Sequence, residues 1–140
     1  MIPKLRAWDK VGKSISSVSE ITYSGDLSYL SFVKLSGNNR LYGPESRLAD
    51  DVIIMQSTGL KDKNGVEIYE GDVIANQNKE PENWYISHHE VVWHDTGFMG
   101  KQICSSGSYI GLNYWTSGEN GYVVIGNIYE NPELLEGAAR

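Results

Sequence analysis

Residues 58–75 indicate the architecture most directly, and they read Thr58-Gly59-Leu60-Lys61-Asp62-Lys63-Asn64-Gly65-Val66-Glu67-Ile68-Tyr69-Glu70-Gly71-Asp72-Val73-Ile74-Ala75. Asn64-Gly65 supplies the two positive-φ positions that a type I′ hairpin turn requires, and Asp62 can cap that turn. Glu70-Gly71-Asp72 makes a second turn into a strand at residues 73–75. Because the two turns are so close, the strands between them are short, which is typical of a small, tightly coiled barrel or sandwich.

Strand patterns continue on both sides of this stretch. The pattern predicts strands at 4–8, 28–35, 52–56, 90–94, 108–114 and 122–129, and a loose strand or loop at 14–20. Gly37-Asn38-Asn39 favours a hairpin into residues 40–42, and the polar segment 76–83 reads as a surface loop. Asn131-Pro132 is a helix start, with Asn131 as N-cap, and Gly137 limits that helix to a turn or two. No sequence repeat is evident.

Length and composition favour one soluble globular protein. The chain has 140 residues, 40% of them hydrophobic and 21% charged, which is enough for a core without metal or disulfide support. We therefore expect a mainly β fold: a small SH3-like barrel or β-sandwich of short antiparallel strands with a short C-terminal helix. Residues 1–140 are expected to form a single domain, in which an N-terminal lobe (1–50) packs on a β-barrel core (51–136).

Composition also bears on location and partners. The start, Met1-Ile2-Pro3-Lys4, has no apolar signal region, and no apolar run is long enough to span a membrane, so we expect a cytoplasmic protein without membrane contact. A single cysteine suits a reducing compartment. Residues 1–47 carry seven basic and four acidic side chains, whereas 48–140 carry five and fourteen. The split could pair two parts of the chain or two copies of it, and the overall net charge of −6 argues against broad nucleic-acid binding.

The histidine-containing segment 88–95 is the one place with metal-ligand residue types close together. In a strand, His88, Glu90 and His94 share one face. His88 and His94 would lie about 20 Å apart, too far to bind one ion. We therefore interpret this segment as an exposed polar strand face and expect no metal or cofactor.

Other reactive patterns are equally incomplete. Cys104 has only Lys101 as a nearby cation in sequence, so it reads as a buried apolar residue rather than a nucleophile. A calcium loop aligned on Gly65 would put Leu60 where a carboxylate is required. With no phosphate-binding, nucleophile-elbow or zinc motif present, the sequence predicts no catalytic residues and no enzyme.

Aromatic and basic residues provide the candidate interaction surface. Trp8, Trp93 and Trp115 could line a binding surface or fill the core, and the core is the more common place for them. The residues selected as the candidate surface are Lys4, Arg6, Trp8, Lys10, Tyr85, Tyr109 and Tyr114. Alternation at 4–8 puts Lys4, Arg6 and Trp8 on one face and Leu5 and Ala7 on the other.

Four blocks resemble the YopX family of phage and prophage proteins. They are Lys4–Asp9, Gln56–Ile74, Val91–Trp93 and Val124–Leu135, in the family's order. Leu5 stands where the family usually has an aromatic residue, and Ser57 where it usually has Tyr. The resemblance implies a mostly β domain of phage or prophage origin in the bacterial cytoplasm. It implies no activity and no site residues, because the matching residues are turn and strand residues.

Three functions follow as hypotheses. The first is a non-catalytic protein that binds an unknown protein partner or a second copy of itself. The second is nucleic-acid binding by Lys4, Arg6, Lys10 and Lys13 with Trp8 as a stacking platform, which the acidic remainder of the chain opposes. The third is a metal-dependent hydrolase that uses His88, Glu90 or His94.

Overall fold

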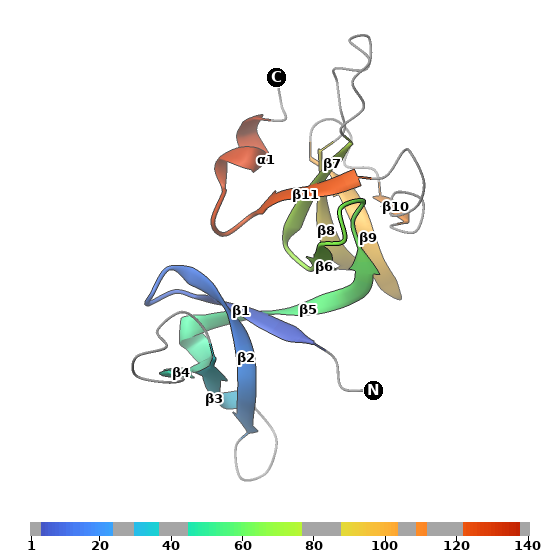
Figure 1. The fold of residues 1–140 in the computed structure, drawn as a ribbon. Coiled ribbons are helices and arrows are strands. Elements are labelled where there is room, and N and C mark those ends of the chain that lie inside the picture. The colour runs from blue at the N-terminus through green and yellow to red at the C-terminus, as the bar shows by residue number, and fades with distance from the viewer. Residues whose placement is uncertain are drawn as a thin grey trace. The chain divides into compact units, whose positions relative to one another are not determined.

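The protein is mainly β, with a short helix near the C-terminal end, as predicted (Figure 1). The computed structural model describes residues 4–23, 30–36, 45–76, 88–103, 109–111 and 122–137. Its elements are β1 (Leu5–Asp9), β2 (Ser14–Tyr23), β3 (Leu30–Leu35), β4 (Glu45–Leu48), the 3-10 helix η1 (Ala49–Asp51), β5 (Val52–Lys61), β6 (Glu67–Tyr69), β7 (Asp72–Asn76), β8 (His88–His94), β9 (Gly97–Gln102), β10 (Tyr109–Gly111), β11 (Tyr122–Asn127) and α1 (Glu133–Gly137). They divide into two compact units, unit 1 (Met1–Gln56) and unit 2 (Ser57–Arg140).

Unit 1 is built around its first strand. β1 pairs antiparallel with β2 on one side and with β5 on the other, and β3 and β4 extend the sheet, giving the order β4-β3-β2-β1-β5. The alternation predicted for residues 4–8 is confirmed, since Ala7 is fully buried while Arg6 and Trp8 are only partly buried. Ala7 clusters with Val33, Leu35 and Val52 to form the core of this unit.

The boundary between the units lies inside one continuous strand. Residues of β5 up to Gln56 pair with β1, whereas Ser57 and Lys61 pair with β6. Gly59 has a φ of 79°, and the register shifts around it, so a glycine bulge lies close to the boundary. Divided here, unit 1 carries seven basic and six acidic side chains and unit 2 carries five and twelve, so the net charges are +1 and −7.

Unit 2 repeats the strand order of unit 1. β7 pairs antiparallel with β8 and β11, and β9 and β10 follow, giving the order β10-β9-β8-β7-β11. In both units the first strand is flanked by the second and the fifth, and the fourth strand is outermost. Neither sheet closes into a barrel through the described residues, so the barrel form of the prediction is not seen there.

The cores of the two units correspond position by position. Ala7 of unit 1 pairs with Ile54 and Ser16. In the same way, Ile74 of unit 2 pairs with Val124 and His89. Ala7 and Ile74 are both completely buried, and Ser16 and His89 are buried polar residues. The fold is therefore duplicated, although the sequence shows no repeat because equivalent positions hold side chains of different size.

Two strands were not predicted, and one turn differs from the prediction. β4 and β9 were missed, β9 because its glycines at 97 and 100 interrupt the apolar pattern. The predicted type I′ turn is wrong, since Gly65 has a φ of 83° but Asn64 has no positive φ. Instead, the Gly65 N–H donates to the Asp62 carbonyl at 3.0 Å, and a left-handed Gly65 completes the turn.

The remaining predictions are met in part. Residues 14–20 belong to a ten-residue strand rather than a loop, and only Tyr109–Gly111 of the predicted strand 108–114 is a described strand. The helix starts at Glu133, as Asn131-Pro132 predicts, but the Asn131 side chain accepts from the Asn127 N–H of the preceding turn. The predicted hairpin at 37–42 and most of the loop at 76–83 lie outside the described residues.

Candidate functional site

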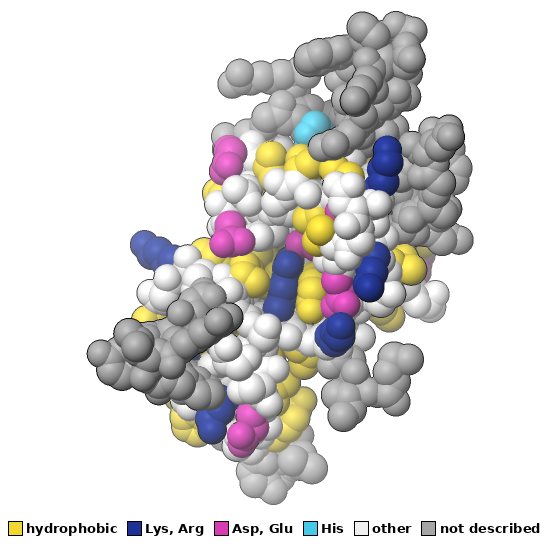
Figure 2. Space-filling view, viewed as in Figure 1, with side chains coloured by type: hydrophobic (Ala, Val, Ile, Leu, Met, Phe, Trp, Pro, Cys, Tyr) yellow, Lys and Arg dark blue, Asp and Glu magenta, His cyan; other side chains and the backbone are white. Residues whose placement is uncertain are grey.

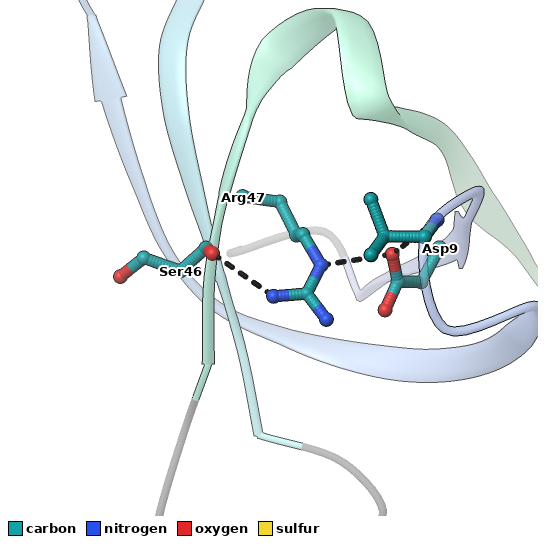
Figure 3. A network of polar contacts seen from close by, with 4 residues as sticks. Asp9, Ser46 and Arg47 are labelled. Carbon is teal, nitrogen blue, oxygen red and sulfur yellow. Dashed lines mark hydrogen bonds and ion pairs between the residues drawn. The ribbon is translucent and has the colours of Figure 1, made fainter.

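Buried Asp9 holds together the ends of unit 1 (Figure 3). Its Oδ1 atom accepts hydrogen bonds from Arg47 Nε and from the Val11 N–H, both at 3.0 Å. Arg47 also donates through Nη1 to the Ser46 carbonyl at 3.2 Å. Burial alone would raise the pKa of Asp9, but hydrogen bonds from Arg47, Gly12 and Val11 and the Arg47 charge outweigh it, so the pKa lies below its usual value. This carboxylate is therefore structural.

Buried Asp62 has the same kind of role in unit 2. Its Oδ1 accepts from the N–H groups of Asn64 and Val66, each at 2.8 Å, and its Oδ2 accepts from the Val124 N–H at 2.9 Å. The predicted capping role of Asp62 is confirmed, and the same side chain also ties the turn to β11. The chemistry of this acidic stretch is thus engaged in backbone hydrogen bonds.

The histidines of β8 alternate between two environments. His89 is 1% exposed and lies edge-on to Tyr122, with ring centroids 5.8 Å apart. His88 and Glu90 point to the other face and are half-buried, so the predicted face is polar but less exposed than expected. Among the described residues, no group of three or more His, Cys, Asp or Glu side chains is placed to hold a metal ion.

A cationic and aromatic cluster lies on that second face, and we call it the Tyr109 surface (His94, Lys101 and Tyr109). Glu90 of β8 pairs with Lys101 of β9, which pairs with Tyr109 of β10, so these side chains share a face. The rings of His94 and Tyr109 are stacked, with centroids 3.7 Å apart and planes 7° apart. Lys101 Nζ lies 6.0 Å from the Tyr109 centroid, and Tyr109 is 41% exposed.

The opposite face of the same hairpin also carries exposed aromatic surface. Trp93 pairs with Phe98 across β8 and β9, and the rings meet edge to face with centroids 4.8 Å apart. Trp93 is 55% exposed, while Phe98 packs against the core of unit 2. A rigid exposed indole on a packed support is well suited to contact another molecule.

Glu90 is the one carboxylate on the Tyr109 face whose environment disfavours its charge. Desolvation by burial raises the pKa of Glu90, and the positive charge of Lys101 opposes that rise. Its partner on the other side, Val73, is completely buried. Carboxylates perturbed in this way are enriched at functional sites, although ion pairs in purely structural sites also perturb them.

The predicted N-terminal candidates do not form an open basic surface. Lys4 and Lys10 are exposed, but Lys10 Nζ donates to the Asp50 carbonyl at 2.9 Å, and Arg6 and Trp8 are only partly exposed. On the described part of the face drawn in Figure 2, basic and acidic side chains are interspersed. A half-buried Trp8 offers little area for stacking with a base, so this arrangement does not favour the nucleic-acid hypothesis.

Of the predicted tyrosines, the structure describes only Tyr109. Tyr85 and Tyr114 lie outside the described residues, as do Cys104 and Trp115. Sequence reasoning did not select Lys101 or the Trp93–Phe98 pair for this surface. The alternation of β8 is a signal for the face of His94, but its stacking on Tyr109 depends on the register of strands far apart in sequence.

Comparison with known proteins identifies related chains. The family model described as YopX protein matches residues 4–136. The chain is also similar to the crystal structure of protein EF1440 from Enterococcus faecalis, with a TM-score of 0.67 and 32% sequence identity over 96% of this chain and 99% of that one. The comparison with curated proteins gives no match. No helix in the described part of the chain is long and apolar enough to cross a membrane.

Proposed function

We propose that this chain, which belongs to the YopX family, is a non-catalytic protein-binding protein that contacts its partner through the Tyr109 surface. The observation that carries the proposal is the exposed Tyr109 ring held by parallel stacking on His94. A ring already fixed in place loses little conformational freedom on binding, and tyrosine is enriched among residues that dominate interface energies.

The charge around this ring supports a protein partner. Unit 2 has a net charge of −7, which repels the phosphate backbone of a nucleic acid. Lys101 and His94 place the cationic groups of this face beside the tyrosine. We therefore expect the partner to present an acidic side chain next to an apolar one, matching Lys101 and the Tyr109 ring.

The non-catalytic part of the proposal rests on what the buried carboxylates do. Asp9 and Asp62 receive hydrogen bonds from Arg47 or from backbone N–H groups, and Asp72 accepts from the Tyr69 N–H at 2.8 Å. These are turn and strand functions. We propose the bacterial cytoplasm of a phage or prophage host as the setting, following the expectation from the family, with an unidentified host or phage protein as partner.

The test is affinity capture of the tagged full chain from its bacterial host, with and without phage genes expressed. Wild type, Tyr109→Ala and the matched control Tyr23→Ala are compared, because Tyr23 is similarly exposed, at 52%, but lies in unit 1. Each sample is divided and one half is treated with nuclease. We expect one stoichiometric protein that survives nuclease, is retained by Tyr23→Ala and is reduced at least about tenfold by Tyr109→Ala.

Other outcomes contradict the proposal in distinct ways. Loss of captured material on nuclease treatment would support the nucleic-acid hypothesis instead. Equal capture by Tyr109→Ala and wild type would remove the Tyr109 surface from the interface. Recovery of the bait alone under every condition would count against a separate protein partner.

A further inference from the structure

A pair of exposed apolar side chains lies on the outer face of unit 1, on strands far from the Tyr109 surface in sequence. Phe32 of β3 pairs directly with Leu48 of β4, so the two side chains lie side by side on one face. Phe32 is 48% exposed and Leu48 is 56% exposed. Their strand neighbour Val33 points the other way and is completely buried in the core.

The neighbouring polar residues on this face are already satisfied within the chain. Glu20 pairs with Lys34 across β2 and β3, and Lys34 Nζ lies 3.7 Å from Glu20 Oε2. Covering this rim therefore desolvates no unpaired charge, whereas a rim that selects a differently charged partner would need one. The face thus has an apolar centre and an internally neutral polar rim, like a small protein interface.

We infer that the outer β3–β4 face (Phe32 and Leu48, with Glu20 and Lys34 at its rim) is a self-association surface that a second copy of this chain covers. Two such antiparallel faces can pack against each other about 10 Å apart, as the sheets of a sandwich do. Unit 1 has a net charge of only +1, so two copies meet without the repulsion that two units of charge −7 would have.

The size of the apolar centre sets the strength of this association. Phe32 and Leu48 each expose roughly 100 Å², so two copies bury about 400 Å² of apolar side chain at the centre, against about 1,600 Å² in total for a standard interface. We therefore expect a reversible dimer that dissociates in the range of tens to hundreds of micromolar, rather than a permanent one.

Sedimentation equilibrium of the full chain tests this inference over roughly 1 to 500 μM. The variants are Phe32→Ser/Leu48→Ser and the control Val66→Ser, which removes an apolar side chain that is 49% exposed in unit 2. Wild type and Val66→Ser should shift from monomer toward dimer with concentration. The double variant should need at least about tenfold more protein for the same shift, with an unchanged circular dichroism spectrum.

Two results would overturn the inference. One is a wild-type chain that stays monomeric throughout the range. The other is a folded double variant that dimerises like wild type, because the interface would then lie elsewhere. Tyr109→Ala is included in the same series and should dimerise normally. This inference does not depend on the proposed function, so failure of one leaves the other standing.

Discussion

Arg47 Nε lies 3.0 Å from Asp9 Oδ1, although β4 and β1 are separated by β3 and β2 in the sheet. Four strands of a flat sheet would place β4 and β1 about 14 Å apart. The contact therefore shows that the sheet of unit 1 coils until its fourth strand faces its first. It joins two residues distant in sequence across the concave side, next to the core formed by Ala7 and Val33.

Removing the arginine should destabilise unit 1 strongly. Arg47→Ala leaves the Asp9 carboxylate, which is 6% exposed, without its charged partner. Breaking a buried pair in this way costs about 3 kcal/mol, although the donors Val11 and Gly12 remain and will reduce the loss. Urea denaturation of Arg47→Ala, Asp9→Asn and the double variant checks this value. Additive losses in the double variant would show that the two side chains do not act as a pair.

Asp9 should also contribute to acid sensitivity. Its folded-state pKa is lower than its usual value of 3.8, so the ionised form stabilises the fold above that value. This contribution is lost as the pH falls from about 3.8 through the lower folded-state pKa. Thermal melts between neutral and strongly acidic pH should therefore show a steeper acid loss for wild type than for Asp9→Asn. Parallel curves for the two proteins would contradict this assignment.

Asp62 makes a similar prediction for unit 2. Asp62→Ala leaves three N–H donors without their acceptor, those of Asn64, Val66 and Val124. Buried donors left in this state cost about 1 to 3 kcal/mol each, with partial recovery through water, so we expect a total loss of about 3 kcal/mol. Asp62→Asn keeps one acceptor oxygen and should lose less. Hydrogen exchange at the Val124 amide should accelerate in both variants, and unchanged protection there would rule out the link to β11.

The local parts of the fold were predictable because they depend on local patterns. Alternation located β1 and β8, and turn residues such as Gly65 and Gly71, with φ values of 83° and 82°, located the tight turns. The division into units was not predictable, since the boundary falls inside the apolar strand β5 and the charge pattern suggested a different division. The duplication was hidden because Ala7 and Ile74 fill equivalent core positions with different volumes.

The candidate site was predictable only at the level of residue type. Tyr109 was selected as an uncommitted tyrosine, and the β8 alternation put Glu90 and His94 on one face, as observed. The pairing of Lys101 with both Glu90 and Tyr109 requires the order β8-β9-β10, which depends on long-range contacts. The sequence therefore indicated the chemical groups but not which of them meet.

Glu90 provides the sharpest test of the Tyr109 face, because its stability effect has the opposite sign to that of Asp9. Burial raises its folded-state pKa above 4.5, so its contribution is fully present below that pH and is lost as the pH rises through the raised value. Glu90→Gln removes a charge that the folded state disfavours. The variant should therefore gain thermal stability relative to wild type between pH 4.5 and neutrality, and the difference should be smallest below pH 4.5.

The control and the reverse variant complete this experiment. Glu133→Gln removes an exposed carboxylate from α1 and should not reproduce the gain. Lys101→Met removes the positive charge that opposes the shift of the Glu90 pKa, so it should destabilise the fold at neutral pH more than at pH 4.5. That loss should be smaller in a Glu90→Gln background, because no carboxylate then remains to be stabilised. Equal losses in both backgrounds would show that Glu90 and Lys101 are not coupled across β8 and β9.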